Sequence, residues 1–297
     1  MKTLHPTLAG LAIALLAAAC GNGKKADPHE SQKIKMDSFA VVCVTGPVKV
    51  NYTEVQGRIY GELYWPGHLD ELNPPVVRGD TLFVSQQPTT RRIKPDRLPV
   101  INLYGPPVRR FETGGHARLT VNSLSAEENL DIVLTGPGDI DLYDLYASNR
   151  LSIYGQGSGD INLKQANCEE LRAVLTGSGD IDISHIGCST ADVSLVGSGD
   201  MELKNLNTRQ VRALQAGTGD IDLKGRCIIA HLAVRSIGDL DAAELEADTV
   251  YARSSGKGDL RCNASGLLYT QTYSSSIIEY AGQPQIEATG RKPRRYR

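Results

Sequence analysis

Seven aspartates recur along this chain at nearly constant intervals, and each follows a glycine in a Gly-Ser-Gly-Asp-Ile turn or a variant of it. Successive aspartates are 21, 20, 20, 20, 19 and 20 residues apart. Carboxylates in a fixed register bind cations, transfer protons in catalysis, or accept hydrogen bonds from backbone amides. The glycine and aspartate pairs are Gly138-Asp139, Gly159-Asp160, Gly179-Asp180, Gly199-Asp200, Gly219-Asp220, Gly238-Asp239 and Gly258-Asp259.

A structural turn is the interpretation we favour for these pairs. Glycine permits a positive φ and close stacking of backbones, and the adjacent aspartate accepts hydrogen bonds from amides of its own turn. Stacked carboxylates about 4.8 Å apart repel by roughly 1 kcal/mol in water, so amides, nearby Lys and Arg side chains or a cation must offset the repulsion. Calcium-binding repeats have a period of about nine residues, and an acidic turn would repel phosphate. We therefore predict no cofactor and no metal.

The segments on either side of each turn alternate apolar and polar residues, which is the pattern of a β-strand. Leu171, Ala173 and Leu175 precede one turn, and Ile181 and Ile183 follow it. This two-residue period places every second side chain on one face, and none of these segments has helical spacing. A weaker third apolar point in each repeat suggests that the chain turns inward once more, at Leu145, Ala166, Ile186, Leu206 and Leu245.

Repetition at a fixed period predicts a solenoid, because each unit can bury its apolar side only against its neighbours. Coils stacked at the spacing of parallel strands predict an all-β fold, a right-handed parallel β-helix with coils of about 20 residues. The one 19-residue step keeps Ala230, Leu232 and Val234 in the inward register if the missing residue lies in the loop before them.

The N-terminus predicts export and a lipid anchor. Lys2 precedes an apolar run from Leu8 to Ala19, and small residues then lead into Cys20. We interpret residues 1–20 as a lipoprotein signal peptide whose Cys20 becomes lipidated, since the run is short for a transmembrane span. Polar residues 21–35 predict a flexible tether. The expected location is the cell envelope, lipid-anchored at the outer membrane, with the periplasmic face and the cell surface both open.

The remaining chain divides by how regular the repeat is. Residues 36–112 contain strand patterns and Pro-rich turns without the period, and we predict irregular N-terminal β coils that cap the rod, with a separate small domain as the alternative. Residues 113–282 are the predicted regular β-helix. Residues 283–297 are basic, and we predict that they form a disordered tail. The alternative is that this tail contacts anionic lipid or polysaccharide.

The order of these features resembles a known family. Val100-Ile101-Asn102-Leu103-Tyr104 comes before Gly114-Gly115-His116-Ala117, and the repeated turns follow. Over roughly residues 36–282 this resembles the head GIN domain of autotransporter-adhesin-like lipoproteins of Bacteroidetes. The resemblance implies a parallel β-helix, an adhesin label that rests on architecture, and no catalytic residues. The chain departs from the family at residues 114–116, where Gly-Ser-Gly or Gly-Ser-Ala is typical.

Catalysis is the rival class of function, because polysaccharide-degrading enzymes also use β-helices. Such a site needs convergent carboxylates in a cleft built by long insertions, whereas these coils vary by a single residue. The histidines are scattered, at His68, His116, His185 and His231 among others. We therefore predict a non-catalytic protein, with a degrading enzyme or a purely structural envelope protein as alternatives.

Binding is the function that we predict instead. A net charge of −2 gives no basis for nucleic-acid binding. We expect flat strand faces that bind glycans or another envelope protein. Glycan binding requires exposed aromatic side chains on one face, for which Tyr154 and Trp65 are the candidates, together with Tyr143 and Tyr146.

The cysteines after Cys20 leave one question open. Cys168 and Cys188 stand 20 residues apart at equal places in adjacent coils, which is within disulfide reach. Buried free thiols that act as small apolar residues are the alternative that we favour, for these two as for Cys43, Cys227 and Cys262.

Overall fold

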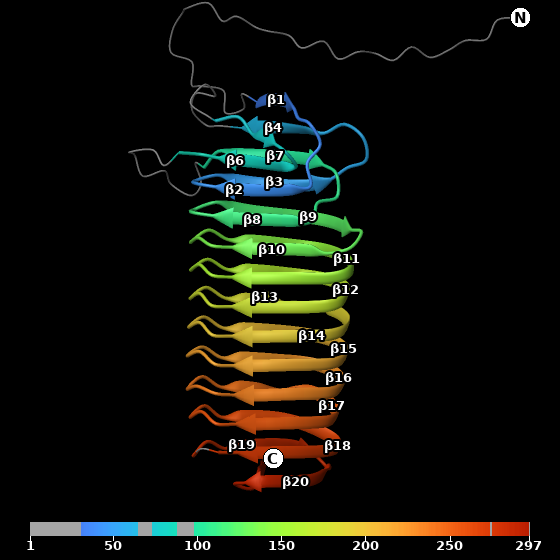
Figure 1. Cartoon of the computed structure of the whole chain (residues 1–297), viewed down its shortest axis with the longest axis vertical. Helices are drawn as coiled ribbons and strands as arrows, with labels where there is room; N and C mark the ends of the chain where they lie inside the picture. The colour runs from blue at the N-terminus through green and yellow to red at the C-terminus, as the bar shows by residue number, and fades with distance from the viewer. Residues whose placement is uncertain (1–30, 65–72, 88–97, 274, 297) are drawn as a thin grey trace, which may run out of the picture.

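The computed structural model describes residues 31–64, 73–87, 98–273 and 275–296, and within these ranges the chain forms strands and no helix. The described part accordingly offers no helical segment that could cross a lipid bilayer. All strands join one sheet that winds into a solenoid of about 9 turns (Figure 1). The predicted all-β parallel β-helix is therefore confirmed. The predicted signal peptide and Cys20 lie outside the described residues, as does Trp65.

The regular part of the rod is a stack of coils of nearly equal length. Each coil pairs in parallel with the next, so that Ile161 lies beside Ile181 and Ile181 beside Met201. The strands of this part are β10 (Leu130–Leu134), β11 (Ile140–Gly155), β12 (Ile161–Leu175), β13 (Ile181–Ile183), β14 (Ile186–Leu195), β15 (Met201–Gln215), β16 (Ile221–Val234), β17 (Leu240–Ser254) and β18 (Leu260–Thr272).

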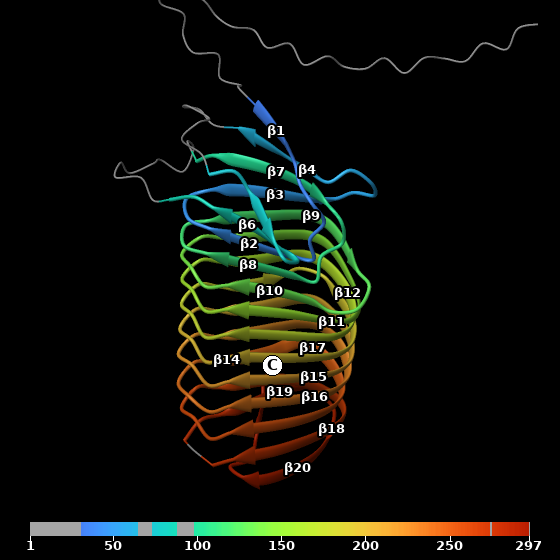
Figure 2. The same cartoon turned by 45° about the horizontal axis from the view of Figure 1, so that its top comes forward.

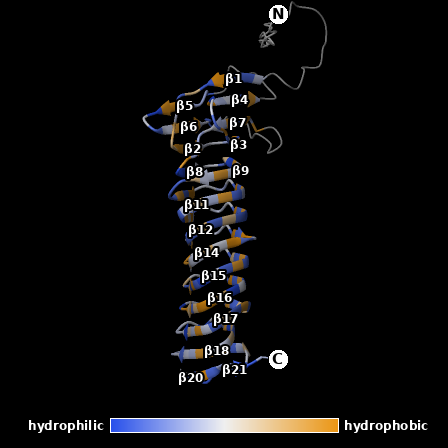
Figure 3. Ribbon diagram, turned by 90° about the vertical axis from the view of Figure 1, so that its right-hand side faces the viewer, coloured by the Kyte–Doolittle hydropathy of each residue, from blue (hydrophilic) through white to orange (hydrophobic). Residues whose placement is uncertain are grey.

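Three inward-facing segments make up each coil. In β11 the alternation of buried and exposed residues is interrupted at the exposed pairs Tyr143–Asp144 and Ser148–Asn149. The chain bends outward at these pairs, and Leu145 between them is buried, as are Ala166, Ile186, Leu206 and Leu245 in other coils. The predicted third inward point is thus confirmed. Apolar residues consequently fill one continuous core along the rod, and polar residues alternate with them on the ribbon (Figure 3).

The 19-residue step is absorbed at a bend of β16. Ala230 pairs with Val211 and Val234 with Gln215, so the inward register predicted for this segment is confirmed. The register shifts between Leu203 and Leu206, where Gly225 takes the place opposite Leu206. Gly225 has a φ of 135°, and a Cβ there would lie 2.2 Å from the carbonyl oxygen of Leu206. The missing residue is therefore accommodated by a glycine at the bend.

The N-terminal coils stack in a different order from their order in the sequence. β2 lies between β6 and β8, and β3 lies between β7 and β9, all in parallel (Figure 2). β1, β4 and β7 then pair antiparallel, as do β5 and β6. The strands are β1 (Ser31–Lys35), β2 (Val41–Thr45), β3 (Lys49–Glu54), β4 (Tyr60–Tyr64), β5 (Val76–Arg78), β6 (Thr81–Ser85), β7 (Val100–Gly105), β8 (Arg110–Gly114) and β9 (Arg118–Ala126).

Both predicted disordered segments contain strands in their described parts. β1 belongs to the predicted tether, and β20 (Gln285–Gly290) and β21 (Arg294–Arg295) belong to the predicted tail. β20 pairs with β18, and β21 pairs with β19 (Ile278–Gly282). Their polar composition predicted disorder, but the ends of the stack offer unpaired backbone N–H and C=O groups that these segments satisfy.

Candidate functional site

The repeated turns stack along one edge of the rod, at the left of the coils in Figure 1. A Cβ placed on Gly199 would lie 2.0 Å from the carbonyl oxygen of Gly179, and one on Gly177 would lie 2.0 Å from that of Gly157. None of the glycines in the described Gly-x-Gly-Asp turns has a positive φ. The expected use of positive φ is therefore wrong, and the close approach of successive backbones is the reason for glycine.

The turn aspartates join each coil to the next. The backbone N–H of Asp200 donates to Oδ1 of Asp180 at 2.8 Å, and the N–H of Asp220 donates to Oδ1 of Asp200 at 2.8 Å. A second bond runs in the opposite direction, from the N–H of Ile181 to the carbonyl of Asp200 at 3.0 Å. The same contacts continue along the aspartate ladder from Asp139 to Asp259.

The donors of the aspartate ladder differ from those predicted. We expected amides of the aspartate's own turn, whereas the structure uses the amide of the following coil. Parallel stacking places that amide directly beside the carboxylate, at the strand spacing of about 4.8 Å. A hydrogen bond to an ionised acceptor is stronger than a neutral one, so the ladder offsets part of the repulsion between its own carboxylates.

A second column of charge lies two residues after the ladder, on the same outward side. Burial and the carboxylate of Glu202 raise the pKa of Asp182, and burial and Asp241 raise the pKa of Asp222. Glu202 instead has a lowered pKa, because Lys204 and Lys224 place their Nζ atoms 2.7 and 3.1 Å from its oxygens. In the residues that the structure describes, no group of three or more His, Cys, Asp or Glu side chains is arranged to hold a metal ion.

The side chains in the outward register before the turns make up a surface that we call the pre-turn face, although Ser152 and Val133 in it are buried. It is built by β8, β10 and the final segments of the coils, so each of its residues lies beside its equivalent in the next coil. One column runs through Arg110, Asp131, Ser152, Arg172, Asp192, Arg212, His231, Tyr251, Tyr269 and Glu287. A second column, two residues further on, includes Val133, Tyr154, Val174, Ser194, Leu214, Ala233, Arg253 and Gln271.

The C-terminal half of the first column is aromatic. The rings of His231 and Tyr251 stack with centroids 4.9 Å apart and planes at 9°, and the ring of Tyr269 follows at 6.0 Å and 53°. We call His231, Tyr251 and Tyr269 the aromatic ladder. Because the rings face one another along the rod, their edges and the tyrosine hydroxyls face solvent; Tyr251 is 39% exposed. Tyr269 Oη accepts a hydrogen bond from the amide of Gln271 at 3.0 Å.

His231 is neutral at neutral pH in this setting. Burial between its neighbours and the positive charge of Arg212 lower the pKa of its imidazole. An uncharged imidazole stacks on Tyr251 without carrying a second positive charge next to Arg212. The aromatic ladder therefore offers both apolar edges and polar hydrogen-bonding groups at neutral pH.

A shallow recess of about 470 Å³ opens on the pre-turn face next to the aromatic ladder. Val174 and Leu214 supply apolar surface, and Arg212 pairs with Asp192 at 3.5 Å across it. Most of the lining residues are charged or polar, so the recess offers hydrogen bonds and charge beside this apolar surface. The lining residues are Glu170, Arg172, Val174, Asp192, Val193, Ser194, Arg212 and Leu214.

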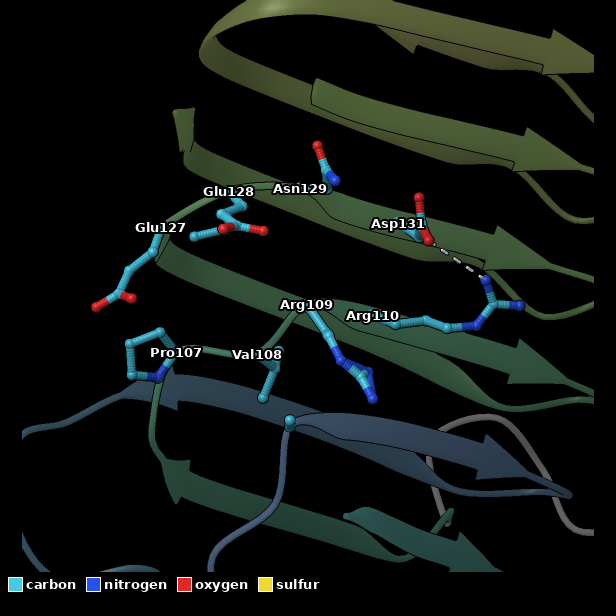
Figure 4. A pocket seen from close by; sticks show the side chains of 10 residues that line it. Pro107, Val108, Arg109, Arg110, Glu127, Glu128, Asn129 and Asp131 are labelled. Carbon is cyan, nitrogen blue, oxygen red and sulfur yellow. Dashed lines mark ion pairs between the residues drawn. The ribbon is translucent and has the colours of Figure 1, made fainter. Parts of the chain in front are cut away.

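A second recess, of about 550 Å³, lies where β8 meets β10 (Figure 4). Its two arginines are already paired: Arg109 with Asp80, and Arg110 with Asp131 at 3.6 Å and Glu112 at 3.2 Å. Glu127 and Glu128 are neighbours in the sequence and line the outer end of this recess. The paired arginines leave the recess weakly suited to hold an anionic ligand.

The structure distributes the predicted aromatic residues over different surfaces. Tyr154 lies on the pre-turn face, with the guanidinium carbon of Arg172 5.9 Å from its ring centroid. Tyr143 and Tyr146 are exposed at the bend and the second segment of β11 instead. The predicted turn residues from Gly138 to Asp259 all belong to the stacked edge. The aromatic ladder was missed, although aligning the coils by their Gly-Asp turns would have brought His231 and Tyr251 into one column; Tyr269 precedes no such turn.

Five cysteines lie in the described residues, and all are free thiols. Cys262 is buried, and Cys43, Cys168, Cys188 and Cys227 are half-buried. Cys262 belongs to the core, and Cys168, Cys188 and Cys227 pack against it. The thiols are free as we predicted, but the predicted burial holds only for Cys262.

Comparisons with known proteins give the same architecture. A family model described as putative auto-transporter adhesin, head GIN domain, matches residues 75–207 and 190–284. Among solved structures, a putative adhesin from Parabacteroides distasonis is 16% identical, with 88% of this chain and 92% of that chain covered and a TM-score of 0.52. At that identity the likeness supports the fold alone.

Two further solved structures are similar in coverage. A putative adhesin from Parabacteroides merdae is 15% identical over 88% of this chain and 91% of that chain, with a TM-score of 0.49. A putative adhesin from Bacteroides fragilis is 20% identical over 90% of this chain and 94% of that chain, with a TM-score of 0.37. No curated protein matches the chain.

Proposed function

The chain belongs to the family of putative auto-transporter adhesins with a head GIN domain, and from this premise we propose that it is a non-catalytic binding module of the cell envelope that holds glycans on its pre-turn face. The observation that carries the proposal is the aromatic ladder beside the recess of about 470 Å³. The tyrosine hydroxyls at the exposed ring edges, and the amide and guanidinium groups beside them, can form hydrogen bonds with sugar hydroxyls.

The repeat of the rod suits a polymeric ligand. Each coil presents an equivalent position about 4.8 Å further along, so a chain of sugars lying along the rod would meet the charged recess and then the aromatic ladder. Arg172 and Arg212 border the recess, and Arg253 lies over the ring of Tyr273 at 5.2 Å. Arg212 is paired with Asp192, so Arg172 and Arg253 are the guanidinium groups that favour glycans carrying carboxylate or sulfate groups.

The glycan proposal is tested by screening residues 21–297 against an array of envelope, capsular and host polysaccharides. Binding to acidic glycans, without release of new reducing ends from them, supports a binding module. Release of reducing ends would indicate the polysaccharide-degrading alternative. A protein partner would be favoured if the array retains no glycan and a pull-down from the cell envelope captures one envelope protein.

Anchoring is part of the same proposal. We place the protein on the outer membrane through lipidated Cys20, because small residues lead into that cysteine after an apolar run. Residues 21–30 would then separate the rod from the membrane. Metabolic labelling with an alkyne fatty acid should mark the full chain and not its Cys20→Ser variant, and equal labelling of both would contradict the anchor.

A further inference from the structure

A column of small side chains runs through the second inward segment of the coils, and three of its members are cysteines. Each residue lies at the equivalent position of the next coil, and the flanking pairs Asn167 with Gly187 and Glu170 with Thr190 set Cys168 beside Cys188. The column consists of Ala126, Ala147, Cys168, Cys188, Thr208, Cys227 and Ala247.

The thiols of Cys168 and Cys188 are hydrogen-bond partners across adjacent coils. Neighbouring parallel strands are about 4.8 Å apart, and disulfides form across Cα separations of about 4.4 to 6.8 Å, so the bond requires no large backbone movement. Cys227 has no such partner, because its neighbours in the column are Thr208 and Ala247. Cys168 and Cys188 are therefore the one adjacent thiol pair among the described cysteines.

Both thiols of the pair are half-buried, and Cys188 also lines a recess of about 420 Å³. Cys227, Thr208, Arg209 and Arg226 are among the other residues that line it. The Nε of Arg226 donates a hydrogen bond to Asn207 Oδ1 at 3.1 Å in this recess. The thiolate is the form of cysteine that attacks a disulfide.

The surroundings of the two thiols shift their pKa values in opposite directions. The thiol of Cys168 donates to Cys188 and lowers the pKa of Cys188 in spite of burial. The pKa of Cys168 is raised, by the same hydrogen bond and by burial. Burial raises the pKa of Cys227 and Cys262 to about 12, and it also raises that of Cys43. Among the described cysteines, Cys188 is thus the one prepared to act as a nucleophile.

We propose that Cys188 and Cys168 form a redox-active pair that closes to a disulfide between β12 and β14 by exchange with a disulfide-bearing oxidant. The Cys188 thiolate attacks one sulfur of the oxidant and forms a mixed disulfide, releasing the oxidant's other sulfur as a thiolate. Cys168 then loses its proton to solvent and attacks Sγ of Cys188, which expels the remaining oxidant thiolate. The two cysteines give up two electrons and two protons, and the oxidant becomes a dithiol.

The disulfide would join coils at an interruption of the stack. The strand of this coil is divided into β13 and β14 at Ser184 and His185, whereas β12 and β15 on either side are continuous. A disulfide from Cys188 to Cys168 in β12 would fix the register of β14 against β12, just after the interruption. The inference is independent of the glycan proposal, since Cys188 does not belong to the pre-turn face.

The test oxidises the purified protein with glutathione disulfide and maps its tryptic peptides without reduction. Cleavage after Lys164, Arg172 and Lys204 places the two cysteines on separate peptides, residues 165–172 and 173–204. We expect these peptides to be linked to each other, and the midpoint of thermal unfolding to rise by at least about 5 °C, a rise that dithiothreitol reverses. Cys227→Ala should retain the link, and Cys188→Ala should lose it.

A second measurement keeps the proposal falsifiable if Cys188→Ala fails to fold. Limited alkylation of the reduced wild-type protein should modify Cys188 at least about tenfold faster than Cys227, because only the thiolate reacts. Linkage of Cys188 to Cys227, glutathione adducts that never resolve into the internal disulfide, or equal alkylation rates would each overturn the proposal.

Discussion

The backbone N–H of Asp200 donates a hydrogen bond to the carboxylate of Asp180, 2.8 Å away and one coil earlier in the rod. The same contact recurs between successive turn aspartates, so the conspicuous acidic repeat of this chain connects coils. Since these carboxylates hold the stack together, the binding surface has to be sought elsewhere, and the pre-turn face is where aromatic and charged groups gather.

Replacement of a ladder aspartate should weaken the stack by a modest amount. Asp200→Ala removes the acceptor of the Asp220 amide, and we expect a loss of about 1 kcal/mol in the free energy of unfolding, because solvent partly replaces the lost bond. Asp200→Asn keeps a carbonyl oxygen at the same place and should lose less. Urea unfolding measures both. An Asn variant as unstable as the Ala variant would speak against the hydrogen bond as the reason for aspartate.

A methyl group on a turn glycine should be far more harmful. The Cβ of Gly199→Ala would lie 2.0 Å from the carbonyl oxygen of Gly179, so the backbones of two coils must separate. We expect a loss of about 3 kcal/mol or more, or failure to fold. Ser198→Ala in the same turn is the control and should change stability by less than about 0.5 kcal/mol. Similar stability of the two variants would refute the stacking argument.

The second charged column predicts opposite effects from two neutralising substitutions. Asp222 has a raised pKa, so its ionisation costs stability at neutral pH, and Asp222→Asn should raise the melting temperature there. Glu202 has a lowered pKa, so Glu202→Gln should lower the melting temperature. Both differences should shrink as the pH falls below about 4, where carboxyls of ordinary pKa are protonated. Differences of the same sign at pH 7 would contradict these assignments.

His231 should make the rod sensitive to mild acid. Its pKa is lowered by burial and by Arg212, so the unfolded chain takes up this proton more readily than the folded one, and stability falls as the pH drops below about 6.5. The melting temperature of the wild type should therefore decrease more between pH 7.5 and pH 5 than that of His231→Gln. Identical pH profiles would show that the stacked imidazole does not resist protonation.

The repeat itself made most of the fold predictable. Inward positions such as Ile181 and Leu206 follow from counting residues between turns, because the core of a solenoid depends on register alone. The insertion of β2 between β6 and β8 could not be read from the sequence, since the period is absent there and the pairings join residues 40 and 69 positions apart. The strand in the basic tail was equally hidden, because it depends on an open edge of β18.

The binding surface was less accessible to sequence analysis than the fold. Tyr154 was predicted as a candidate and lies on the pre-turn face. The aromatic ladder could not be predicted in the same way, because it requires the register across three coils, including the step of 18 residues from Tyr251 to Tyr269. That step is shortened by register shifts between Ala242 and Thr249, which lie in the bends. Composition carries no trace of them.

The affinity of residues 21–297 for an acidic glycan selected on the array, measured by titration calorimetry, tests the proposed role of the pre-turn face most directly. Tyr251→Ala should weaken binding at least about tenfold, since it removes the centre of the aromatic ladder, and Tyr146→Ala, which is 52% exposed on another surface, should leave the affinity unchanged. Equal affinity of the wild type and Tyr251→Ala, with both proteins folded, would contradict a glycan site on this face.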